Sequence, residues 1–171
     1  AESIYLQWSR PIYGDYMIYE NDSTYNAVSF TILRDDTPIQ VNIINNSYVD
    51  ETTDYNTEYI YEISSISLLD FDPFVSSEYD VLTRPGIPTL SYNSNINSID
   101  LTWTDPLGTG SNNQIDYLIE REWSVADEDY DDIIINNLFS NNYSDMGLLN
   151  NSSFGYSVRA HNNSGYSGWS D

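Results

Sequence analysis

The chain repeats itself, and this repeat limits its possible folds more than any other feature. "SIYLQWSRP" (Ser3–Pro11) matches "SIDLTWTDP" (Ser98–Pro106) at an offset of 95 residues. The same offset of 95 aligns six further pairs: Tyr48 with Tyr143, Asp50 with Asp145, Tyr59 with Phe154, Tyr61 with Tyr156, Ile63 with Val158, and Phe74 with Trp169. In the middle the register slips, because Phe30-x-Ile32-x-Arg34 fits Tyr117-x-Ile119-x-Arg121 at an offset of 87. Matching ends with compensating loops indicate two copies of one module.

Each copy reads as a series of short β-strands. Apolar and polar residues alternate in runs such as "AVSFTIL", "IQVNII" and "DYLIERE", which are separated by clusters of Asn, Asp, Gly, Ser and Pro. No segment shows the apolar stripe of an amphipathic helix, so the sequence predicts an all-β chain. "TRPGIPTL" (Thr83–Leu90) holds two prolines and a glycine and marks the joint between the copies. We therefore predict one domain over residues 1–84 and another over residues 85–171.

The composition predicts a folded, strongly acidic protein. Hydrophobic residues make up 40% of the chain and include 16 Tyr and 4 Trp, which is enough apolar material for a core. Asp and Glu number 27 against five Arg, no lysine is present, and the net charge is −22. Such a surface repels nucleic acid and anionic lipid. No stretch is apolar over the roughly 18 residues of a membrane span. We expect neither nucleic-acid binding nor membrane insertion.

The second copy resembles a fibronectin type III domain in the order and spacing of its motifs. "SIDLTWTDP" looks like that family's strand B, "IDYLIERE" like strand C, and "NYSDMGLLNNSSFGYSVRAHNNSGYSGWS" like its E–F–G stretch. The resemblance implies two Ig-like β-sandwiches in tandem, with Trp8 and Trp103 as inward core residues of strand B. The family's tyrosine-corner position is Tyr59 in the first copy. Phe154 takes this position in the second copy, where the hydroxyl's hydrogen bond is lost.

The resemblance also implies that each copy lacks one strand within the chain. The first copy begins at strand B and so lacks strand A, although "EYDVLT" (Glu78–Thr83) supplies its strand G. The second copy has a strand A candidate in "IPTLSY" (Ile87–Tyr92) but lacks strand G. Two explanations are open: the residues belong to a longer tandem array, or a neighbouring chain supplies the missing strands. Uncovered strand edges otherwise invite pairing with other chains.

The segment Tyr166-Ser-Gly-Trp169-Ser170 differs by one aromatic residue from the Trp-Ser-x-Trp-Ser signature of cytokine receptors, which are also paired type III domains. That resemblance implies a structural role in which Arg159 stacks on the Trp169 indole. The chain departs from the receptor pattern because it has no cysteine.

An acidic run and a set of sequons are the other candidate sites. "DEDYDD" is either a calcium site or a solvated loop, and its five carboxylates are those of Asp127, Glu128, Asp129, Asp131 and Asp132. Asn-x-Ser/Thr sequons predict N-glycosylation if the protein is exported by a cell with that machinery. Their asparagines are Asn21, Asn45, Asn142, Asn150, Asn151 and Asn162.

The sequence predicts a binding or structural role rather than catalysis. It shows no nucleophile arrangement, phosphate loop or metal triad, so we expect no enzyme and no cofactor other than calcium. The leading hypothesis is a spacer, stalk or filament module of an extracellular or cell-surface repeat protein, whose partners are neighbouring β-sandwich domains. One alternative is an accessory module that binds glycans or a receptor, with Tyr13, Tyr16 and Tyr19 stacking on sugars. Another is a virion or appendage subunit completed by strand exchange.

Overall fold

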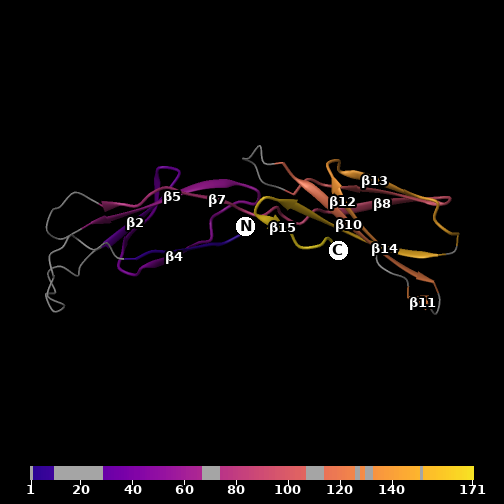
Figure 1. The fold of residues 1–171 in the computed structure, drawn as a ribbon, viewed down its shortest axis with the longest axis horizontal. Coiled ribbons are helices and arrows are strands. Elements are labelled where there is room, and N and C mark those ends of the chain that lie inside the picture. Colours follow the sequence, from indigo (N-terminus) through magenta and orange to yellow (C-terminus); the bar gives the residue numbers. More distant parts are fainter. Residues whose placement is uncertain are drawn as a thin grey trace. The chain divides into compact units, whose positions relative to one another are not determined.

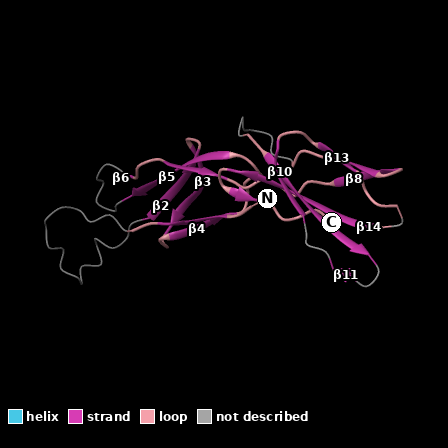
Figure 2. Cartoon of the chain, turned by 45° about the vertical axis from the view of Figure 1, so that its right-hand side comes forward, coloured by secondary structure: helices cyan, strands magenta, loops and turns pink. Residues whose placement is uncertain are grey.

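The computed structural model describes residues 2–9, 29–66, 74–106, 114–125, 128–129, 133–150 and 152–171. Within these ranges the regular elements are β-strands and no helix occurs (Figure 2), which confirms the all-β prediction. The chain divides into two compact units (Figure 1). Unit 1 holds Leu82–Asp171 with the short segments Ala1–Glu2 and Asp54–Thr57, and unit 2 holds Ser3–Thr53 and Glu58–Val81. The domain boundary after residue 84 stays a prediction.

Unit 2 is built from two sheets. One sheet pairs β1 (Ile4–Gln7) with β4 (Ser47–Asp50). The other has β5 (Glu58–Ile66) as its hub, and β5 pairs with three other strands. Its members are β3 (Thr37–Ile43), β2 (Ser29–Arg34), β5, β6 (Phe74–Val75) and β7 (Tyr79–Leu82).

Unit 1 repeats this plan with one more strand in the smaller sheet. That sheet runs in the order β13 (Asn142–Met146), β9 (Ser98–Trp103), β8 (Leu90–Asn95). In the larger sheet, β10 (Asp116–Val125) and β14 (Ser153–Asn162) pair along nine residues. The same sheet includes β11 (Glu128–Asp129), β12 (Ile133–Leu138) and β15 (Gly165–Tyr166).

Residues with positive φ shape a turn of unit 2 and one strand of each unit. Asp35 and Asp36 form the two-residue turn between β2 and β3, with φ of 51° and 61°. Positive φ at both central residues is the requirement of a type I′ hairpin, and Asp tolerates it better than most residues. Asn42 in β3 and Asn137 in β12 both have left-handed backbone, with φ of 57° and 56°. These two residues are 95 positions apart, so the two copies share this irregularity as well as their strands.

The two cores contain equivalent aromatic pairs with the same packing geometry. In unit 2 the rings of Trp8 and Phe30 meet edge to face at 5.3 Å and 68°. In unit 1 the rings of Trp103 and Tyr117 meet at 5.3 Å and 66°. Edge-to-face packing is a favoured arrangement of aromatic rings. The repeat found in the sequence is therefore a repeat of core geometry.

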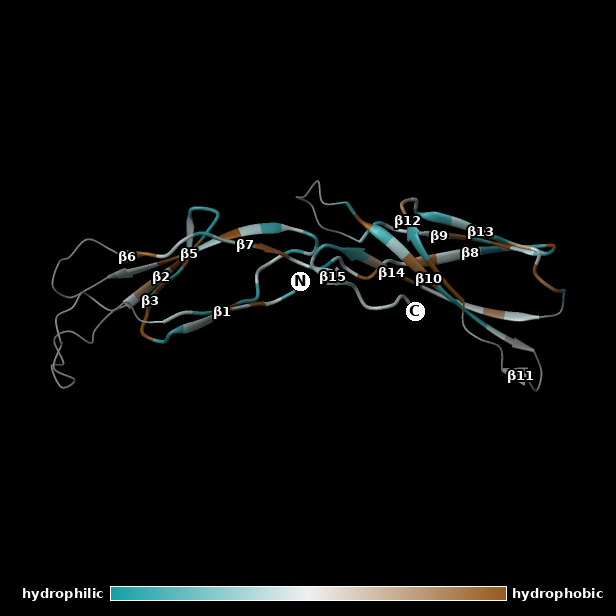
Figure 3. Cartoon of the chain, in the orientation of Figure 1, coloured by the Kyte–Doolittle hydropathy of each residue, from teal (hydrophilic) through white to brown (hydrophobic). Residues whose placement is uncertain are grey.

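The cores differ in how well they are covered. Leu101, Trp103 and Val158 of unit 1 are buried, with exposed fractions of 1%, 5% and 0%. Their counterparts in unit 2 are only half-buried: Leu6, Trp8 and Ile63. Figure 3 shows the hydropathy of each residue, and apolar and polar residues alternate along strands such as β10. Similar residues therefore reach different burial in the two units.

Candidate functional site

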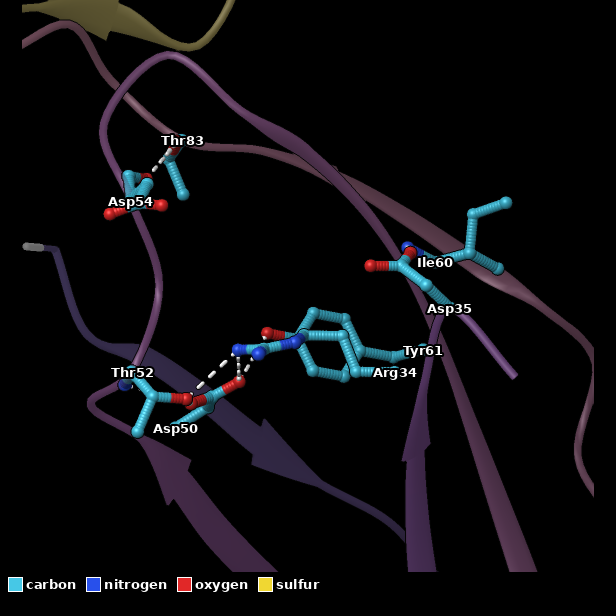
Figure 4. Close-up of polar contacts among 8 residues, drawn as sticks. All are labelled: Arg34, Asp35, Asp50, Thr52, Asp54, Ile60, Tyr61 and Thr83. Carbon is cyan, nitrogen blue, oxygen red and sulfur yellow. Dashed lines mark hydrogen bonds and ion pairs between the residues drawn. The ribbon is translucent and has the colours of Figure 1, made fainter. Parts of the chain in front are cut away.

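A polar cluster links the two sheets of unit 2. Asp50 ends β4, whereas Arg34 and Tyr61 belong to β2 and β5 of the other sheet. The Asp50 Oδ2 atom accepts hydrogen bonds of 2.8 Å from both the Arg34 guanidinium and the Tyr61 hydroxyl (Figure 4). The Thr52 hydroxyl and backbone N–H donate to its Oδ1 atom at 2.7 and 2.9 Å. We call Arg34, Asp50 and Tyr61 the unit 2 clamp.

Unit 1 contains the same clamp, formed by Arg121, Asp145 and Tyr156. The Arg121 guanidinium and the Tyr156 hydroxyl each donate to Asp145 Oδ2 at 2.8 Å. Asp145 lies in β13, and its two partners lie in β10 and β14 of the other sheet. The carboxylate side chains of Asp50 and Asp145 are 0% and 6% exposed. Each sandwich is therefore joined across its sheets by an ion pair whose carboxylate is buried and whose arginine is partly exposed.

The surroundings fix the protonation state of the unit 2 clamp. Burial opposes ionisation of Asp50, but the bonds from Thr52 and Tyr61 and the charge of Arg34 outweigh it, so the pKa of Asp50 lies below its ordinary value. Burial and the nearby Asp50 carboxylate raise the pKa of the Tyr61 hydroxyl far above its ordinary value. At neutral pH the carboxylate is charged and the phenol keeps its proton. The groups bind one another rather than a ligand.

Each clamp arginine also lies over an aromatic ring. The Arg34 guanidinium is 4.8 Å from the centre of the Tyr59 ring, and that of Arg121 is 5.9 Å from the centre of the Phe154 ring. Tyr59 and Phe154 are the tyrosine-corner pair of the sequence alignment. A guanidinium stacks on either kind of ring, so the change from Tyr to Phe preserves this contact.

The sequence alignment pairs every clamp residue with its counterpart in the other copy, but it does not predict that the three residues of one clamp touch. The two arginines align at an offset of 87 residues, whereas the aspartates and the tyrosines align at an offset of 95. A signal was present, since arginine is scarce in a chain of net charge −22 and two of its five arginines fall at matching positions. In a chain with few cations and many anions, the cations are expected beside buried carboxylates, because a buried charge needs a partner.

Both units share a second kind of contact, in which serine side chains bond the backbone along the edge of the larger sheet. Ser170 donates its backbone N–H to the Val158 carbonyl at 2.8 Å, and its hydroxyl accepts the Val158 N–H at 3.0 Å. Ser76 makes the same two bonds with Ile63, both at 2.9 Å. Ser167 repeats the pattern on Ala160 at 2.8 and 3.0 Å. The serine hydroxyls thus satisfy backbone donors that would otherwise lack a partner.

These bonds correct one pair of the sequence alignment. The sequence alignment sets Phe74 against Trp169, but in the structure Ser76 is the counterpart of Ser170, so the offset here is 94 residues. In unit 2, Phe74 and Val75 pair regularly with Ser65 and Ser64. In unit 1, both Gly168 and Trp169 lie between the two serine contacts, one residue more than regular pairing needs. An extra residue of this kind bends a strand and redirects side chains.

The extra residue accompanies a stack on the outer side of β14. The Arg159 guanidinium lies 4.1 Å from the centre of the Tyr166 ring and 4.3 Å from that of the Trp169 ring. The structure thus brings together the arginine and the tryptophan of the predicted motif. His161 extends the stack, because its ring lies 4.3 Å from that of Tyr166 and its Nδ1 atom is 2.8 Å from an Asp116 oxygen. The bulge therefore turns Trp169 onto the face of the sheet.

The sequons divide by burial. Asn45, Asn142 and Asn150 are exposed, and Asn21 and Asn151 lie outside the described residues. Asn162 is 2% exposed, and its amide nitrogen donates to the Asn56 side chain and the Thr83 carbonyl, both at 2.9 Å. Its amide oxygen accepts the Ser164 N–H at 2.8 Å. A glycan needs this nitrogen and open space around it, so the Asn162 prediction is corrected: this sequon has no room for a glycan in folded unit 1.

The other predicted sites are only partly described. Asp127, Asp131 and Asp132 of the acidic run lie outside the described residues, as do Tyr13, Tyr16 and Tyr19. Glu128 and Asp129 form β11, which pairs with the end of β10. Within the described side chains, no group of three or more His, Asp or Glu could hold a metal ion. The same residues contain no helix that is long and apolar enough to cross a bilayer.

Comparison with known proteins shows the fold. No protein-family model matches the chain, and no curated protein matches its sequence. Its structure is similar to a two fibronectin type-III domain segment from chicken tenascin, with 13% identity over 98% of this chain and 88% of that one, at a TM-score of 0.52. It also matches the FN1–FN3 domains of chicken CNTN1, with 17% identity and a TM-score of 0.38. That match covers 85% of this chain and spans 55% of the CNTN1 chain.

These findings, with the strand order and the paired cores, show that the chain has the fold of two fibronectin type III sandwiches in tandem. The resemblance found in the sequence is confirmed at the level of fold.

Proposed function

We propose that the chain is a non-enzymatic structural and adhesive module of an extracellular, cell-surface or filament-forming repeat protein. The observation that carries this proposal is the duplicated clamp. Both units join their sheets through the same Arg–Asp–Tyr set, with hydrogen bonds of 2.8 Å in each copy. Its two carboxylates are buried, and each one is bound by the arginine and the tyrosine of its own clamp. Two of the five arginines hold the sheets together in this way, and this use of them favours a mechanical role over a chemical one.

The surface supports the same proposal. A net charge of −22 without lysine keeps like modules apart laterally and keeps the protein soluble. Pro85 fixes one backbone angle at the start of the second copy, and a proline at a joint stiffens it. The partners in this proposal are further β-sandwich domains, of the same protein or of neighbouring subunits, outside the cell.

Force spectroscopy on the intact chain tests the mechanical role. Pulled from its two ends, the chain is expected to unfold in two separate events, each of which releases about 3.3 to 3.6 Å for every residue freed. Tyr61→Phe and Tyr156→Phe form a matched pair, because each removes one hydroxyl from one clamp. Each substitution is expected to lower the force of one event and leave the other unchanged. A chain that extends without force peaks would contradict the proposal.

A further inference from the structure

Unit 1 contains a turn that comes from the first copy of the repeat. This turn is Asp54–Thr57, whereas the residues on either side of it, Thr53 and Glu58, belong to unit 2. Along the chain it connects β4, which ends at Asp50, to β5, which begins at Glu58. Its middle residues therefore belong to one unit and its two ends to the other. We call Asp54–Thr57 the shared turn.

The segment that leads into the second copy binds the shared turn. Asn56 donates its backbone N–H to the Arg84 carbonyl at 2.9 Å, and Thr83 donates its backbone N–H to the Thr57 carbonyl at 3.0 Å. The Thr83 hydroxyl accepts the Thr57 N–H at 2.8 Å and donates to the Asp54 carbonyl at 2.7 Å (Figure 4). The turn is thus fixed to this segment by both backbone and side-chain bonds.

Asn162, the last residue of β14, binds the same turn from within the second copy. Its amide nitrogen donates to the Asn56 side-chain oxygen and to the Thr83 carbonyl, both at 2.9 Å. An amide nitrogen has two N–H donors, so both are used on residues that precede the second copy. Asn56, Thr83 and Asn162 are 4%, 1% and 2% exposed. Buried polar groups at this depth lose stability when a partner is removed, because water cannot replace it.

The residue types around this contact suit its geometry. Asn56 has a left-handed backbone with φ of 48°, which asparagine tolerates better than most residues. The Asn162 side-chain oxygen accepts the Ser164 N–H at 2.8 Å, which fixes the orientation of the amide. The Tyr55 ring lies close to Gly86, where a Cβ atom would meet the ring at 3.2 Å. The shared turn is therefore held by specific contacts on several sides.

We infer that the shared turn and Asn162 couple the folding of the two units, so that each unit is more stable while the other is folded. When unit 2 is folded, β4 and β5 fix both ends of the turn. When unit 2 unfolds, these ends are free, and ordering the turn against Asn162 costs conformational entropy. Coupling of this kind is reciprocal, so loss of the Asn162 bonds must also destabilise unit 2. The inference goes beyond the proposed function and does not rest on it.

Amide hydrogen exchange of the intact chain, followed by NMR, tests the coupling. Amides of β2 and β5 report on the opening of unit 2, and those of β10 and β14 report on the opening of unit 1. Asn162→Ala removes two buried hydrogen bonds and is expected to speed exchange about tenfold in both units. Asn163→Ala changes the exposed neighbour of Asn162 and should leave both units unchanged.

A second pair of variants reads the coupling in the opposite direction. Asn56→Gly removes the acceptor in the shared turn and keeps the left-handed backbone, so it is expected to speed exchange in β10 and β14. Asn42→Gly makes the same change in β3, where φ is 57°, and should leave β10 and β14 unchanged.

Three results would overturn the inference. The first is faster exchange in unit 1 alone with Asn162→Ala, and the second is no change in either unit. The third is an equal effect of Asn56→Gly and Asn42→Gly on β10 and β14. If Asn162→Ala loses the fold, the comparison of these two glycine variants still decides the question.

Discussion

The two units share their strands and clamps but differ in the cover over their cores. In unit 1, β8 lies along β9, and Trp103 is 5% exposed. In unit 2, β1 has no described neighbour on that side, and Trp8 is half-buried beside a cavity of about 370 Å³. Both tryptophans nevertheless make the same edge-to-face contact at 5.3 Å. The difference shows that core residues set the geometry of a sandwich, while a neighbouring strand decides how far its core is shielded from water.

The largest effect is expected at the two tryptophans. Trp103→Ala should lower the unfolding free energy of unit 1 by about 4 kcal/mol, since it removes a buried aromatic residue and leaves a cavity. Trp8→Ala should cost about 2 kcal/mol in unit 2, because part of that side chain is already in contact with water. Urea unfolding followed by NMR signals of each unit measures both. Equal losses in the two units would contradict the difference in cover.

The clamps should respond alike. Asp50→Asn and Asp145→Asn each leave an arginine without its counter-ion, so each is expected to destabilise its own unit by about 3 kcal/mol. The same urea experiment reads the result, and each variant serves as the control of the other. A loss below about 1 kcal/mol in either unit would show that its ion pair behaves like an exposed one.

Acid titration sharpens the comparison at the unit 2 clamp. The pKa of Asp50 is lowered in the folded state from an ordinary value of 3.8. A lowered pKa gives stability that is present above the ordinary value and is lost as pH falls through the folded-state value. Unit 2 should therefore lose stability as pH drops below about 3.8, and Asp50→Asn should weaken this dependence. Urea unfolding at a series of acid pH values tests it. An unchanged slope in the variant would remove Asp50 as the cause.

The smallest effect is expected at the stack on β14. Arg159→Leu removes the cation between Tyr166 and Trp169 and should destabilise unit 1 by about 0.5 to 1 kcal/mol. Arg159→Lys keeps the charge but not the planar group, and is expected to recover only part of the loss. Thermal unfolding of unit 1 measures both, with unit 2 as the internal reference. A larger loss in Arg159→Lys than in Arg159→Leu would contradict the stacking account.

The fold could be predicted from the sequence because period-two alternation is a local signal, and the repeat at 95 residues presents it twice. Trp8 and Trp103 could be paired by the identity of their neighbours alone. The clamps were not readable in this way. Arg34 and Asp50 lie in different sheets, so their 2.8 Å contact depends on how the sheets face each other, which no local pattern encodes.

Two details that differ from the plan shared by the copies depend on single residues. The offset of 94 at Ser76 follows from one extra residue between Ser167 and Ser170, and alignment by residue type placed Phe74 on Trp169 instead. Asn162 carries a sequon like the exposed ones, but its amide is used in three hydrogen bonds. Burial of that kind is set by packing and cannot be read from a triplet.

Amide hydrogen exchange in the unliganded chain tests the central claim most directly. The claim is that two copies of one sandwich differ in the strand that covers the smaller sheet. The account predicts slow exchange at Leu6 and Trp8, as at Leu101 and Trp103, because these strands pair with β4 and β13. It predicts protection at Thr104, which donates to Thr89, and fast exchange at its counterpart Ser9. Equal protection of Thr104 and Ser9 would contradict it.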